Sequence, residues 1–167
     1  MQILLATLDD ARAVAEIHVA TWRDAYRGIV PTEHFVTKTV ESCEAGLRET
    51  IIKGTSQLYV AKKDSIVVGW VSFGSSRDPG ATKLDGEIWA IYVASAHWSS
   101  GVGKALWLKA SSVLKGQGYK RISVWVLAEN KRAIQFYHKA GFAIEPIAEK
   151  DVVMSGKTLK EICLVNV

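Results

Sequence analysis

The segment that most constrains this chain is residues 86–109, GEIWAIYVASAHWSSGVGKALWLK. It opens with an apolar run, residues 88–94, of a length typical of a buried strand. Gly101 and Gly103 then precede apolar residues that recur at helical spacing. A helix start presents N–H groups without intrahelical partners and a partial positive charge, and glycine lets a ligand approach the backbone. The segment is therefore a candidate phosphate cradle, with Lys104 as an added positive charge.

Two other glycine-rich motifs compete for this segment. A P-loop requires GxxxxGK followed by Ser or Thr, but Trp98 occupies the first glycine position and Ala105 follows Lys104. A dinucleotide fingerprint requires GxGxxG, and Leu106 replaces its third glycine. Glu129, after the next apolar strand, could still bind a ribose. The P-loop fails at two positions, whereas a nucleotide-binding oxidoreductase stays open as an alternative.

Two motifs resemble the GNAT superfamily of acetyl-CoA-dependent N-acetyltransferases. Residues 98–103, WSSGVG, are similar to the signature Gln/Arg-x-x-Gly-x-Gly/Ala, with Trp98 in place of Gln or Arg. Residues 130–142, NKRAIQFYHKAGF, are similar to Asn-x-x-Ala-x-x-Phe-Tyr-x-x-x-Gly-Phe. The order of expected elements matches this fold over nearly the whole chain. The resemblance implies acetyl-CoA as the acyl-donor cosubstrate and no metal.

The fold class expected is α/β, more fully an α+β mixed sheet. Periodicity and turn residues predict about seven strands in a mixed sheet and about four helices on its faces. The resemblance to the GNAT fold implies that this central sheet is mostly antiparallel and is flanked by the helices. The chain should form one N-acetyltransferase domain over residues 1–167. Helices are predicted at residues 8–23, 40–53, 102–114 and 131–140. Strands are predicted at residues 2–6, 57–62, 65–74, 84–94, 119–127, 142–147 and 159–165.

Composition excludes several function classes. The net charge of +4 includes no long basic run, so no nucleic-acid partner is expected. The sequence contains no apolar run of about 18 residues, so no membrane span is predicted. The first ten residues lack the pattern of a signal peptide, and Cys43 and Cys163 have no metal-type spacing. We therefore expect a cytoplasmic protein with reduced thiols.

Acetyl transfer from a thioester to an amine requires a base for the amine, a donor for the oxyanion and an acid for the departing thiolate. The resemblance implies that Glu87, at the start of the central strand, is the base. It implies that Tyr137 is the general acid. It also implies that the backbone at Ile91 and Val93 supplies the oxyanion donor and pairs with pantetheine.

The resemblance also assigns the walls of the site. Asn130 is a helix N-cap in its own right, to which the family adds a contact to the cofactor. Trp22, Tyr26 and Ile29 either wall the acceptor site or pack a helix junction, and His18 is expected to be a packing residue. The cofactor-binding residues are expected to be Ile91, Val93, Trp98, Ser99, Ser100, Gly101, Val102, Gly103, Lys104 and Asn130.

These features predict an acetyltransferase that moves an acetyl group from acetyl-CoA to a primary amine by direct attack in a ternary complex. The acceptor would be a small molecule or a peptide, and a homodimer is the default expectation. The alternative is a non-catalytic sensor module that binds acyl-CoA. Glu87 and Tyr137 argue against a sensor, because binding alone needs neither residue.

Overall fold

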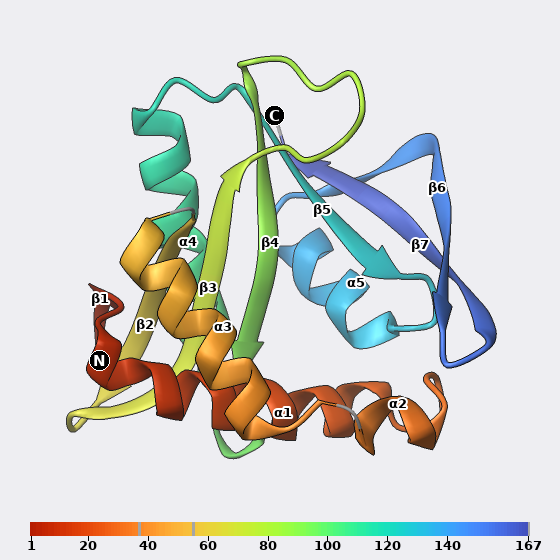
Figure 1. The fold of residues 1–167 in the computed structure, drawn as a ribbon. Coiled ribbons are helices and arrows are strands. Elements are labelled where there is room, and N and C mark those ends of the chain that lie inside the picture. Colours follow the sequence, from red (N-terminus) through yellow and green to blue (C-terminus); the bar gives the residue numbers. More distant parts are fainter. Residues whose placement is uncertain (37, 55, 167) are drawn as a thin grey trace.

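The computed structural model describes residues 1–36, 38–54 and 56–166. In these residues seven strands form one sheet in the order β1-β2-β3-β4-β5-β7-β6 (Figure 1). Neighbouring strands are antiparallel except β4 and β5, which are parallel. The fold class expected from the sequence is therefore confirmed.

The bounds of the elements follow the chain in simple order. The strands are β1 (Gln2–Leu5), β2 (Gln57–Lys63), β3 (Ile66–Ser75), β4 (Asp85–Val93), β5 (Arg121–Leu127), β6 (Ala143–Met154) and β7 (Lys157–Asn166). The α-helices are α1 (Ala11–Tyr26), α2 (Thr32–Val36), α3 (Val40–Lys53), α4 (Val102–Gly116) and α5 (Lys131–Lys139). Two 3-10 turns are Leu8–Asp10 and Ser95–His97.

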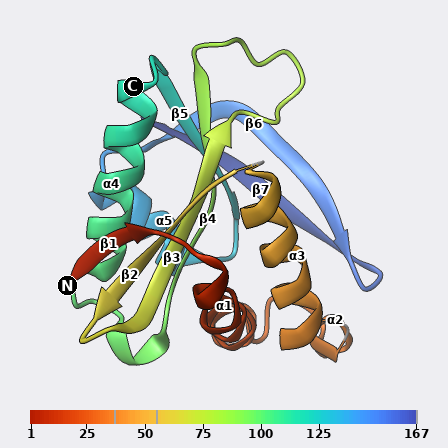
Figure 2. The same ribbon diagram turned by 60° about the vertical axis from the view of Figure 1, so that its left-hand side comes forward.

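Helices cover both faces of the sheet. Figure 2 shows α4 on one side of the sheet and α1 and α3 on the other. Successive strand residues point to opposite faces, so Val60 packs in the core beneath α1 while Ala61 packs in the core beneath α4. Helix α5 adds Tyr137 to the core on the α4 side. The two packed faces hold β4 rigidly at the centre of the molecule.

The ends predicted for several elements match the structure. Gly54 ends α3 with a φ of 59°, and Gly141 follows α5 with a φ of 90°. Both are left-handed conformations that glycine adopts without a steric penalty. The side-chain oxygen of Asn130 accepts a hydrogen bond from the Ala133 N–H at 3.1 Å. The prediction that Asn130 caps α5 is confirmed.

Other boundaries predicted from the sequence are wrong. The sixth strand does not end at residue 147 but continues to Met154, because Ser155 and Gly156 both have positive φ and form a two-residue hairpin turn. The turn after β2 is at Asp64 and Ser65, one residue later than predicted, for the same reason. Helix α1 extends to Tyr26, and α2 was not predicted.

Asp10 joins the start of α1 to the sheet. It is 4% exposed, and its carboxylate accepts hydrogen bonds from the Thr7 N–H and hydroxyl, both at 3.0 Å. Lys62 Nζ on β2 lies 2.6 Å away. Burial alone would raise the pKa of Asp10, but the bonds from Lys62 and Thr7 outweigh it and hold the pKa below the ordinary value of 3.8.

We expect Asp10→Ala to lower the free energy of unfolding by about 2–3 kcal/mol at neutral pH, because it leaves Lys62 without its partner. Since the folded-state pKa of Asp10 is depressed, its contribution is present above pH 3.8 and is lost as the pH falls through the folded-state value. Urea unfolding at several pH values measures both effects. The control is Asp9→Ala, because Asp9 is exposed. Equal losses for the two variants would contradict the anchoring role.

Candidate active site

The sheet opens between its two parallel strands. Residues 85–88 of β4 pair with residues 121–124 of β5, and the pairing stops there. Beyond this point the strands diverge, with β5 still bonded to β7 and β4 still bonded to β3 (Figure 1). The second half of β4 therefore has a backbone edge that no strand of the described residues covers.

The backbone at Val93 and Ile91 faces this opening. The N–H of Ala94 donates to the Val68 carbonyl on the β3 side at 3.0 Å. Backbone groups of successive strand residues point to opposite sides, so those of Val93 point away from β3 and, by the same alternation, so do those of Ile91. This is the direction required of an edge that pairs with an extended ligand arm.

A pocket of about 510 Å³ fills the opening. Elements from distant parts of the chain line it: α1, β4, the start of α4, β5 and α5. Ten residues predicted for the site lie in its wall, namely Tyr26, Ile91, Val93, Trp98, Ser99, Gly101, Gly103, Lys104, Asn130 and Tyr137. Glu87, Ser100, Val102, Trp22 and Ile29 are not part of this lining.

The start of α4 has the geometry of the predicted cradle. Gly101 is the N-cap with a φ of 88°, and a Cβ built on it would meet nothing within 4 Å. A Cβ on Gly103 would lie 3.1 Å from the ring of Phe136 on α5. Glycine at position 101 thus permits the turn, and glycine at position 103 permits the close approach of α4 to α5.

Basic side chains contribute to the lining of the pocket. Lys104 on α4 and Arg132 and Lys139 on α5 all line it, together with His97. The first N–H groups of α4 lie at the start of that helix and add the positive end of the helix dipole there. The combination favours an anionic group such as a pyrophosphate.

Trp98 connects α4 to the end of β4. Its indole N–H donates to the Val93 carbonyl at 2.7 Å, and the hydroxyl of Thr21 donates to the same oxygen at 3.3 Å. The Arg132 guanidinium lies 3.7 Å from the centroid of the indole ring. The residue that departs from the signature therefore braces the cradle and places a cation beside it. Sequence patterns did not reveal this bracing.

Tyr137 lies on α5 in the pocket wall. It is buried, and the centroid of its ring lies 5.0 Å from that of Phe136 and 5.2 Å from that of Phe142. Burial raises the pKa of the Tyr137 phenol well above its ordinary value, and the nearby Tyr26 phenol raises it further. The phenol is therefore neutral at physiological pH and holds the proton that a general acid needs. Its role as general acid stays a prediction.

Glu87 lies elsewhere. Its side chain is 1% exposed and accepts hydrogen bonds from the Arg77 backbone N–H at 2.8 Å and from Arg77 Nε at 3.1 Å. Arg77 Nη2 pairs with the same carboxylate. The residue anchors the loop between β3 and β4, a role that the sequence did not indicate because the partner is ten positions away in an irregular segment. Its role as base stays a prediction.

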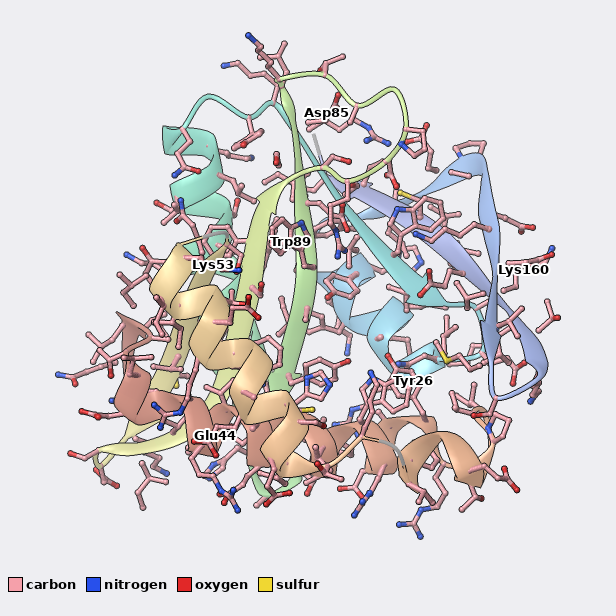
Figure 3. The ribbon with its side chains drawn as sticks, in the orientation of Figure 1. Tyr26, Glu44, Lys53, Asp85, Trp89 and Lys160 are labelled. Atoms are coloured by element: carbon pink, nitrogen blue, oxygen red, sulfur yellow. The ribbon has the colours of Figure 1, made fainter. Side chains whose placement is uncertain are left out.

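The three aromatic and apolar candidates in and just after α1 divide into two groups. Tyr26, on the last turn of α1 close to α5, lines the pocket (Figure 3). Trp22 is buried behind it in a core cluster that Ile29 also contacts. The ring centroids of Trp22 and Tyr26 are 4.9 Å apart. Trp22 thus supports Tyr26 from outside the pocket.

Two tryptophans in the pocket wall were not singled out from the sequence. Trp89 lies in the β4 bulge and Trp125 lies on β5, at the point where the strands diverge. Both carboxylate oxygens of Asp78 accept the indole N–H of Trp125, at 2.8 and 3.0 Å. A tryptophan inside each of two apolar, strand-like runs was the available signal.

The remaining polar candidates have structural surroundings. His18 stacks on Trp70 with centroids 5.6 Å apart, and burial, with a smaller effect of Lys38, lowers its pKa to about 4. It is therefore a neutral packing residue, as expected. Among the residues that the structure describes, no group of three or more His, Cys, Asp or Glu side chains could hold a metal ion. No described helix is long and apolar enough to cross a membrane.

Comparison with known proteins identifies the family. Residues 11–142 match the family model of the acetyltransferase (GNAT) family. The chain belongs to the GNAT acetyltransferase family. The resemblance inferred from residues 98–103 and 130–142 is thereby confirmed, and the protein is an acetyltransferase by family.

Individual relatives cover nearly the whole GNAT chain. An uncharacterized N-acetyltransferase, YuaI of Bacillus subtilis, is 31% identical over 95% of this chain and 88% of its own length. The spermidine N(1)-acetyltransferase of Thermoplasma acidophilum is 23% identical over 94% of this chain and 97% of its own. The crystal structure of the PaiA N-acetyltransferase from Thermoplasma acidophilum, in complex with coenzyme A, has a TM-score of 0.80 at 20% identity, covering 99% and 97% of the two chains. The PaiA structure and this chain share the fold.

Proposed function

We propose that the protein transfers an acetyl group from acetyl-CoA to a primary amine by direct attack within a ternary complex. One observation carries the proposal: a single pocket joins the basic start of α4 to the open edge of β4, with Tyr137 in its wall. Residues from α1 to α5 contribute to this pocket, so we propose that residues 1–167 act as one acetyltransferase domain. The PaiA structure, which contains coenzyme A, supports the choice of donor.

Acetyl-CoA binds along the pocket from the α4 end. The pyrophosphate accepts hydrogen bonds from the first amides of α4, and Lys104, Arg132 and Lys139 neutralise its charge. The pantetheine arm pairs with the open edge of β4 at Ile91 and Val93. Ser99, Ser100, Val102 and Asn130 complete the cofactor contacts proposed from the family motif. The thioester then lies at the level of Tyr137.

The reaction needs one proton donor and one proton acceptor. The amine nitrogen attacks the thioester carbonyl, and a backbone N–H of β4 stabilises the oxyanion. As the carbon–sulfur bond breaks, the Tyr137 phenol donates its proton to the thiolate. We keep Glu87 as the acceptor of the amine proton. Glu87 lies outside the pocket wall and its carboxylate is paired with Arg77, so this transfer requires a relay between the pocket and Glu87.

A panel of primary amines tests this function. The purified protein, acetyl-CoA and each amine are mixed, and release of the coenzyme A thiol is measured against a sample without amine. We expect amine-dependent release, with an acetylated amine as the second product. Tight binding of acetyl-CoA without release in any sample would instead support the sensor alternative, and titration of NADH tests the oxidoreductase alternative.

A further inference from the structure

The loop of residues 76–84, between β3 and β4, lies against the two strands that diverge at the pocket (Figure 1). The Arg77 guanidinium lies 5.0 Å from the ring centroid of Trp89 on β4. Both carboxylate oxygens of Asp78 accept the indole N–H of Trp125 on β5, at 2.8 and 3.0 Å. Both tryptophans line the pocket. The loop therefore brings one cation and one carboxylate beside residues of the pocket wall.

The carboxylates of Glu87 and Asp78 are engaged in different ways. Glu87 is 1% exposed and accepts three bonds from Arg77, one of them from its backbone N–H. Its charge is therefore already compensated inside the protein. Asp78 is half-buried, and among the described residues the Trp125 N–H is the one donor to its carboxylate. A carboxylate has about four lone-pair sites, so Asp78 keeps acceptor capacity for a further donor.

Two cations near Asp78 are paired with other carboxylates. Arg77 pairs with Glu87, and Lys150, which lies over the indole that Asp78 holds, is 3.5 Å from Glu161. Among the residues that the structure describes, no ion pair joins Asp78 itself to a cation. A half-buried carboxylate without a cationic partner favours a charge-assisted hydrogen bond from the ammonium group of a ligand.

The proposed function needs such a carboxylate at the pocket. An amine nitrogen must lose protons to become an amide, and the described residues that line the pocket include no aspartate or glutamate. His97 also lines the pocket, but it ends the turn that leads into the α4 cradle, where the proposal places the pyrophosphate. A transfer to Glu87 requires a relay. Asp78, bonded to the pocket-lining Trp125, is placed to begin it.

We propose that Asp78 is the first acceptor of the amine proton and the start of the relay toward Glu87. The substrate ammonium gives one proton to an oxygen of Asp78, and its nitrogen keeps the electron pair that attacks the thioester carbon. When the carbon–sulfur bond breaks, sulfur takes the bonding pair and the Tyr137 proton, and a second nitrogen proton restores Tyr137. Asp78 passes its proton on to Glu87 or to solvent, so the products are an amide, a thiol and one released proton. This inference rests on the proposed function.

Asp78→Asn tests the proton step with little change of shape. The asparagine keeps one oxygen for the Trp125 N–H but cannot accept a proton from an ammonium group. We expect kcat/KM for the most active amine of the panel to fall about a hundredfold or more, the contribution of general base catalysis. The affinity for acetyl-CoA, measured by isothermal titration, should change less than about twofold. Asp151→Ala, an exposed change on β6, is the control.

Asp78→Ala and added formate separate proton transfer from positioning. Formate is a small carboxylate that fits the space left by the side chain, and we expect it to restore the rate of Asp78→Ala in proportion to its concentration. It should leave Tyr137→Phe unchanged, because that variant lacks a proton donor. Turnover by Asp78→Asn within about twofold of wild type, or no rescue of Asp78→Ala by formate, would overturn this inference alone. No release by the wild-type protein with any amine would overturn the proposed function as well.

Discussion

Tyr137→Phe is expected to lower kcat about a hundredfold or more while changing acetyl-CoA affinity less than about twofold, since general acid catalysis contributes 10²–10⁴-fold. The change removes only the hydroxyl, so the packing of the ring against Phe136 and Phe142 remains. Stopped assays of coenzyme A release give kcat, and isothermal titration with acetyl-CoA gives the affinity.

The pKa of Tyr137 adds a pH dependence to this prediction. Because burial raises that pKa, the phenol stays protonated throughout the usual assay range, including alkaline pH. We therefore expect no fall in the wild-type rate at high pH from deprotonation of Tyr137. Tyr137→Phe should accordingly remove no high-pH decline from the profile. Tyr119→Phe is the matched control, because Tyr119 is half-buried and lies outside the pocket lining. Equal losses in kcat and in acetyl-CoA affinity would remove the acid role.

Gly103→Val is expected to weaken acetyl-CoA binding about tenfold to a hundredfold, as overpacking costs about 1–3 kcal/mol. The new Cβ would lie 3.1 Å from Phe136 and 3.8 Å from Val93, in the wall of the pocket. The added methyl groups extend into the space that the proposal gives to the cofactor. Isothermal titration with acetyl-CoA measures the loss directly.

The control for this change is Gly116→Val, in the last turn of the same helix. A Cβ there meets nothing within 4 Å, so the variant reports the general effect of valine in α4. Position 101 is less suitable, because its φ of 88° strains any side chain and mixes folding with binding. Acetyl-CoA binding that survives intact in a folded Gly103→Val protein would contradict the cradle.

Local chemistry made much of this structure predictable. Asn130, Gly54 and Gly141 mark the ends of helices through contacts within a few residues, and sequence spacing records such contacts. The glycines at 101 and 103 likewise act within one turn of α4. The hydrophobic period located each strand of the sheet, although hairpin turns with positive φ moved two of the boundaries.

Contacts between distant segments could not be predicted in the same way. The ion pair of Glu87 with Arg77 and the bonds from Trp125 to Asp78 connect strands to an irregular loop. Nothing in residues 76–84 has a period that would place those side chains. The bond from Trp98 to the Val93 carbonyl depends on how the chain turns between β4 and α4. Such partners follow from the tertiary fold and had no local signal.

The short parallel junction of β4 with β5 divides the sheet into two arms, one of four strands and one of three. Only four residue pairs join them, and the buried Ser123 hydroxyl adds a bond to the Gly86 carbonyl at 3.3 Å. The angle between the two arms sets the width of the opening between β4 and β5. Substitutions at this seam, where Val124 is the one residue that also lines the pocket, can therefore change which ligands fit.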